Sequence, residues 1–144
     1  MKTLTKTVVL LTGLCLATGA LAQKLAVIVN VSNPASSITK EQVQDFYYRK
    51  VRQWPDGTAL RFFDRGEDSP ERSDFLKSVM KKTARQLDQY WISQKLVSGA
   101  SAPTPVGPDR LVESLVSRFP GGMSYVSESF VPSKGVKVLK ITGD

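Results

Sequence analysis

The sequence predicts an α/β fold in which helices pack on one mixed β-sheet. One reason is the continuous run of apolar, mostly β-branched residues at 25–29, which is typical of a strand buried on both faces. Another is that short strand-like runs alternate with segments of helical periodicity along the rest of the chain. Helix-start signals separate these segments. Thr39 and Gln42 have capping-box spacing, and Ser69-Pro70 places an N-cap residue before a proline at the first helical position.

The first half of the chain contains two expected strands and one helix. In order, we expect a strand at 25–29, a break at 31–34, a helix from 39 to about 48, a turn at 54–57 and a strand at 59–63. Within the helix, Val43, Phe46 and Tyr47 should face the sheet, because they share one helical face.

The second half contains three expected helices and two strands. In order, we expect a helix from Ser69, a helix at 83–96, an internal loop at 99–108, a helix ending before Pro120, and strands at 123–126 and 136–141. The side chains expected in the core share apolar helical faces or are large aromatics: Trp54, Phe75, Leu76, Val79, Met80, Leu87, Trp91, and the stripe of Leu111, Val112, Leu115, Val116 and Phe119.

Residues 1–22 have the pattern of a bacterial export signal. Lys2 and Lys6 precede an apolar run at 8–16, and Ala20-Leu21-Ala22 supplies small residues at the cleavage positions. The apolar run is shorter than the roughly 20 residues that span a bilayer. We therefore expect cleavage after Ala22, a periplasmic location, and a single domain at 23–144.

The composition of residues 23–144 excludes several kinds of chemistry. The chain has no histidine, and its one cysteine, Cys15, lies in the expected signal. Most metal sites, thiol chemistry and general acid–base catalysis use one of these residues, so we expect neither an enzyme nor a cofactor. The formal charge is +7 for the whole chain and falls to +5 without Lys2 and Lys6. Because export argues against nucleic acid as a partner, this charge favours anionic solutes, anionic lipid head groups or an acidic protein surface.

Several segments resemble the phosphate-type substrate-binding proteins of bacterial ABC uptake systems. The matching segments, in order, are 27–30 (VIVN), 39–43 (TKEQV), 46–50 (FYYRK), 54–57 (WPDG), 64–69 (DRGEDS) and 120–126 (PGGMSYV). The resemblance implies a type II periplasmic-binding-protein-like fold. Because those proteins have two lobes and more than twice this length, it implies a single lobe here. It also implies a periplasmic protein that binds a small oxyanion such as phosphate, with a periplasmic or inner-membrane protein as a further partner.

Two loops that follow strands are the expected binding site. One contains Ser32 and Asn33, and the other runs from residue 64 to Ser69. Open α/β sheets bind ligands at the carboxyl ends of strands, so we expect both loops at one sheet edge. The helix that starts at Ser69 offers N–H groups to an oxyanion, and Arg65 and Arg72 could add charged contacts. The resemblance itself carries only Arg65 and Ser69 to this site.

Two features of the sequence favour an alternative function. Pro70 removes one N–H at the helix start, and four carboxylates crowd the loop: Asp64, Glu67, Asp68 and Glu71. Ser69 could therefore be only an N-cap, with the acids offsetting the helix dipole. In that interpretation the protein is a periplasmic interaction module that keeps the one-lobe fold without a ligand. The aromatic and basic segment at 46–54 would be its contact surface, unless its aromatic residues belong to the core.

Overall fold

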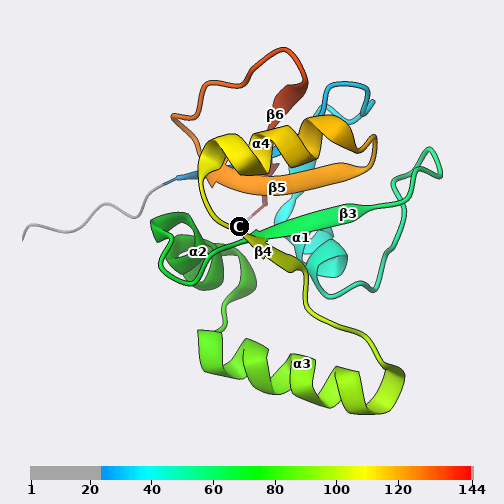
Figure 1. The fold of residues 1–144 in the computed structure, drawn as a ribbon, viewed down its shortest axis with the longest axis vertical. Helices are drawn as coiled ribbons and strands as arrows, with labels where there is room; N and C mark the ends of the chain where they lie inside the picture. Colours follow the sequence, from blue (N-terminus) through cyan, green and yellow to red (C-terminus); the bar gives the residue numbers. More distant parts are fainter. Residues whose placement is uncertain (1–23, 144) are drawn as a thin grey trace, which may run out of the picture.

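The computed structural model describes residues 24–143, which form one six-stranded sheet with helices on both faces (Figure 1). The strand order is β2-β6-β1-β5-β3-β4. The strands are β1 Leu25–Asn30, β2 Ser37–Thr39, β3 Arg61–Arg65, β4 Thr104–Val106, β5 Gly122–Ser127 and β6 Val136–Thr142. The expected export signal and its cleavage position lie outside the described residues. Among the described helices, none is long and apolar enough to cross a membrane.

The sheet is mixed, and the direction of its central strand decides where the loops lie. Strand β1 is antiparallel to both of its neighbours, β5 and β6. Strand β3 is parallel to β5 on one side and to β4 on the other, and β2 is parallel to β6. Strands β1 and β3 therefore run in opposite directions within one sheet.

The helices form two layers, one on each face of the sheet. Helix α4 (Asp109–Arg118) covers one face, where Val112 and Val116 pack on a cluster that includes Ala26 and Ile28. The other face is covered by α1 (Lys40–Tyr47), α2 (Pro70–Phe75), the π-helical turn η1 (Leu76–Met80) and α3 (Ala84–Ser98). Val27 and Val29 of β1 belong to this second cluster. The apolar residues of β1 are thus buried on both faces, as its sequence predicts.

The local signals in the sequence predict most helix boundaries correctly. Thr39 and Gln42 form the expected capping box at α1, Ser69 caps α2, and Thr83 caps α3. The α/β fold class and the expected core are confirmed for Trp54, Phe75, Leu76, Val79, Met80, Leu87 and Trp91, which are all buried.

Three details of the sequence prediction are wrong. Strand β3 begins at Arg61 rather than at residue 59, because residues 53–59 close a turn through the Gln53–Ala59 bridge. The expected loop at 99–108 contains β4, an edge strand, where Pro105 is tolerated. Leu111 is 51% exposed and Leu115 is only half-buried, because Val112 and Val116 are the residues of α4 that face the sheet.

Only glycine fits at positions 121 and 122, directly after α4, because a side chain there would collide with backbone atoms. A Cβ atom on Gly121 would lie 1.7 Å from the carbonyl oxygen of Ala59, and one on Gly122 would lie 2.9 Å from the carbonyl oxygen of Val116. The close approach lets α4 end directly against the turn before β3, and Gly121 also accepts a hydrogen bond from the indole of Trp54 at 3.1 Å.

Candidate functional site

The two predicted binding loops lie at opposite edges of the sheet, so the expectation of one shared edge is wrong. The first loop follows the end of β1, and the second follows the end of β3. Because β1 is antiparallel to β5 and β3 is parallel to β5, these two strand ends point in opposite directions. The structure therefore separates Ser32 and Asn33 from Arg65, Ser69 and Arg72.

The loop after β1 is occupied with contacts that hold the fold together. Asn30 lies at its start, and its side-chain amide donates to the carbonyl oxygens of Val116, Ser117 and Phe119 at 2.9–3.2 Å. The Asn30 side-chain oxygen accepts from both the N–H and the hydroxyl of Ser32, at 2.9 and 2.7 Å. Asn33 is buried and accepts from the N–H of Ala35. This loop thus caps the carboxyl end of α4, and Ser32 and Asn33 belong to its internal turn.

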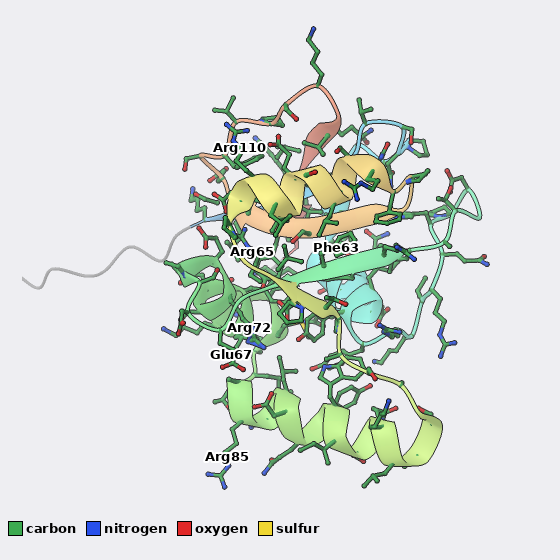
Figure 2. The ribbon with its side chains drawn as sticks, in the orientation of Figure 1. Phe63, Arg65, Glu67, Arg72, Arg85 and Arg110 are labelled. Carbon is green, nitrogen blue, oxygen red and sulfur yellow. The ribbon has the colours of Figure 1, made fainter. Side chains whose placement is uncertain are left out.

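Arg65 is the central residue of the second loop. It is the last residue of β3, is 3% exposed, and lies beside the start of α4 (Figure 2). Its Nη1 donates to the carbonyl oxygen of Tyr125 at 3.2 Å, and its Nη2 donates to the carboxylate of Asp109. The Oε2 atom of Glu71 lies 3.9 Å from the same Nη2. The Nε atom is buried and has no hydrogen-bond partner within the described part of the chain.

Asp64 ties the loop to the core through two tyrosines. Its Oδ1 accepts from the hydroxyl of Tyr125 at 2.5 Å and from the N–H of Arg65 at 2.8 Å. Its Oδ2 accepts from the hydroxyl of Tyr47 at 3.1 Å and lies 3.6 Å from Nε of Arg72. Burial, and secondly the negative charge of Asp64, raise the pKa of both tyrosine hydroxyls above the ordinary value. Both tyrosines therefore remain protonated hydrogen-bond donors.

Ser69 is an N-cap in the structure. Its hydroxyl oxygen accepts from the N–H of Arg72 at 3.1 Å, and the hydroxyl donates to Oε2 of Glu71 at 2.8 Å. Arg72 points from α2 toward α3 and borders a cavity with Leu87 and Trp91 (Figure 2). Glu67 and Asp68 are exposed. The carboxylates next to the arginines are thus Asp64, Glu71 and Asp109, not the whole acidic run.

The site contains three residues that the sequence analysis did not single out. The sequence indicates Tyr47 as a core residue within the 46–50 motif and Tyr125 as part of the 120–126 motif. The hydroxyl of Tyr125 is the only signal in the sequence for a polar role at this position. Asp109 directly follows Pro108 at the start of α4, which is the position where an acid usually offsets the helix dipole. Its contact with Arg65 joins residues that lie 44 positions apart, so no local pattern contains it.

Three of the four aromatic residues of the segment at 46–54 belong to the core rather than to a contact surface, and Tyr48 is half-buried. Phe46, Tyr47 and Trp54 are 5%, 1% and 5% exposed. The basic residues between them, Arg49 and Arg52, are exposed. The structure thus favours the core interpretation of these aromatics over the surface interpretation.

The described residues thus form an α/β domain with a buried, charge-paired arginine at the end of a parallel strand. The PBP superfamily domain matches residues 19–142, and the chain belongs to this family. The resemblance noted in the sequence is thereby confirmed at the level of the family.

Solved structures of phosphate transport proteins share this fold. An ABC-type phosphate transport receptor from Vibrio cholerae is 18% identical, with a TM-score of 0.63, and the match covers 83% of this chain and 46% of the receptor. A putative phosphate ABC transporter substrate-binding protein with bound phosphate from Clostridium perfringens is 21% identical, with a TM-score of 0.65 and coverage of 83% and 45%. PstS from Borrelia burgdorferi is 16% identical, with a TM-score of 0.63 and coverage of 83% and 47%. The matched part of this chain thus corresponds to about half of each solved protein.

Proposed function

We propose that this chain is an exported, periplasmic member of the family that binds a small oxyanion such as phosphate at Arg65. The observation that carries the proposal is the state of the Arg65 guanidinium. It is 3% exposed, it faces carboxylates from two different helices, and its Nε has no partner among the described residues. The site therefore already holds anionic oxygen atoms against a buried arginine.

In this proposal an oxyanion enters by exchange with a carboxylate. Three carboxylates face the guanidinium groups of Arg65 and Arg72, so an additional anion would meet net negative charge. The Asp109 side chain is 46% exposed, and it can turn into water without a large desolvation change. A phosphate oxygen then takes its place on Nη2 of Arg65, and Nε gains an acceptor. The Ser69 hydroxyl can change its acceptor from Glu71 to the ligand.

Calorimetric titration of the purified exported protein with phosphate and with sulfate tests this proposal. Arg65→Gln should weaken binding by about tenfold or more, as expected for the loss of a hydrogen bond to a charged group. Arg110→Gln is the matched control, because Arg110 carries the same charge and is 77% exposed on α4. Absence of binding at millimolar phosphate and sulfate, or equal weakening by both variants, would contradict the proposal.

The interaction module remains the second candidate, and a different surface now supports it. Helix α3 buries Leu87 and Trp91, but Ile92, Leu96 and Val97 of the same helix are 62%, 83% and 80% exposed, and Ile92 and Leu96 border the same cavity as Leu87 and Trp91. In Figure 1, α3 lies outermost on its face of the molecule. If the protein does not bind oxyanions, Leu96→Asp should abolish capture of a periplasmic or inner-membrane partner without changing the fold. Unchanged partner capture by that variant would count against the module.

A further inference from the structure

A second cavity lies away from the Arg65 site. It has a volume of about 640 Å³ and lies between the end of α1, the start of β3 and the loop between α3 and β4. Phe46, Leu60 and Phe62 contribute apolar surface to its lining. Small-molecule sites commonly have volumes of about 300–1,000 Å³ and combine an apolar lining with a few polar groups. Because Arg65 is at the opposite end of β3, this cavity does not belong to the site described above.

The charges at the cavity are all positive. Arg49, Arg52 and Arg61 line it, and its lining contains no aspartate or glutamate. Within residues 24–143, none of these three arginines forms a salt bridge. The guanidinium of Arg61 lies 4.1 Å from the ring centre of Phe119, which fixes its position. Arg49 and Arg52 are exposed and have their charges available for an anion.

The backbone at Arg49 has the left-handed conformation with which helices commonly end. Its φ angle is 57°, in the left-handed region that glycine and asparagine adopt most easily. Helix α1 ends at Tyr47 with Tyr48 as its C-cap, and the N–H of Arg49, the next residue, donates to the carbonyl oxygen of Phe46 at 3.2 Å. The end of α1 thus places a long cationic side chain in the lining of the cavity.

We infer that this cavity binds a small amphipathic organic anion, with its acidic group on Arg49 and Arg52 and its apolar body on Phe46, Leu60 and Phe62. The acidic group is required because the charged side chains of the lining are all arginines. The apolar body is required because an inorganic ion would leave the aromatic and leucine surface in contact with water. The ligand class therefore differs from the oxyanion proposed for Arg65.

Fluorescence titration with anilinonaphthalene sulfonate tests this inference, because the probe joins one acidic group to an aromatic body. The double variant Arg49→Asn with Arg52→Gln should lower the affinity at least about tenfold, the effect of losing one good hydrogen bond to a charged group. Asparagine is chosen at position 49 because it tolerates the left-handed backbone.

The matched control is the double variant Lys50→Gln with Lys95→Gln. It removes the same net charge, but Lys50 lies outside the lining and pairs with Asp45, and Lys95 borders the other cavity beside Trp91. The control should bind the probe as the unchanged protein does. Equal losses in the two double variants would show that only the net charge matters, and would overturn the inference.

A third variant tests the cavity without removing an arginine. Ser98 is exposed and lines the cavity at the end of α3, so Ser98→Glu places a carboxylate next to the arginines. It should abolish probe binding in a protein whose melting temperature is preserved. Octanoate should displace the probe, whereas octanol and inorganic phosphate should not. Displacement by octanol or phosphate as effective as that by octanoate, or unchanged probe binding by Ser98→Glu, would overturn the inference.

Discussion

Replacing Asp109 by asparagine separates the two roles of the carboxylate on Arg65. Asparagine keeps an oxygen that can accept from Nη2 of Arg65, but it removes the negative charge. Arg65 is 3% exposed, whereas the Asp109 side chain is 46% exposed, so the lost charge attraction is partly screened by water. We expect Asp109→Asn to lower the free energy of unfolding by about 1–2 kcal/mol.

The same change should strengthen oxyanion binding. In the unchanged protein the ligand must displace a carboxylate, whereas in Asp109→Asn it displaces a neutral amide. If the ligand recovers the charge attraction that the variant lost, phosphate affinity should rise by about tenfold, which corresponds to about 1.4 kcal/mol. Thermal unfolding with and without phosphate measures both effects, because a ligand that binds only the folded state stabilises it by RT ln(1 + [L]/Kd). Sodium chloride at equal ionic strength controls for screening.

Asp68→Asn is the comparison that can refute this reasoning. It removes the same charge from the same region, but Asp68 is exposed. We expect it to change stability and phosphate affinity by much less than Asp109→Asn does. If the two variants gain the same affinity, or if Asp109→Asn loses affinity, Asp109 does not occupy the ligand position.

Three further predictions concern the fold, its pH dependence and export. Asn30→Ala removes the amide that caps α4 and should destabilise the protein by about 2–4 kcal/mol in urea unfolding, without changing phosphate affinity; unchanged stability would contradict the capping role. The raised pKa of Tyr125 means that the folded state holds this proton more tightly than the unfolded chain does, so the free energy of unfolding should fall as pH rises above about 10. In Tyr125→Phe, the free energy of unfolding should decrease less as pH rises, which denaturation at a series of alkaline pH values measures. A pH profile identical to that of the unchanged protein would contradict the role of Tyr125. Mass spectrometry of the exported protein should find Gln23 at the N-terminus, and an intact Met1 or a lipidated Cys15 would contradict the expected signal.

The features that the sequence predicts well depend on neighbouring residues. The capping box of Thr39 and Gln42, and the cap at Ser69, need contacts within three positions along the chain. The buried strand at 25–29 is recognisable because each of its faces needs apolar side chains. The position of Arg65 at the end of a strand can be read from the sequence and is seen at the end of β3, whereas its role in binding stays a prediction.

The contacts of the site could not be predicted, because they depend on strand direction and on distant residues. The antiparallel direction of β1 places Ser32 and Asn33 far from Arg65, and no residue pattern within β1 encodes that direction. The carboxylate that pairs with Arg65 belongs to Asp109 rather than to the acids next to it in sequence. Local crowding of charge was visible in the sequence, but the partner of each charge was not.

Helix α4 is held at its two ends by contacts of different kinds. Its carboxyl end is fixed by neutral hydrogen bonds from Asn30, whereas its first residue, Asp109, is held by the charge of Arg65. Any anion that takes the place of Asp109 on Arg65 would release the start of α4 and leave its end attached. Occupancy of the site would then change the freedom of helix α4. Amide hydrogen exchange at the first turn of α4 would report that change directly.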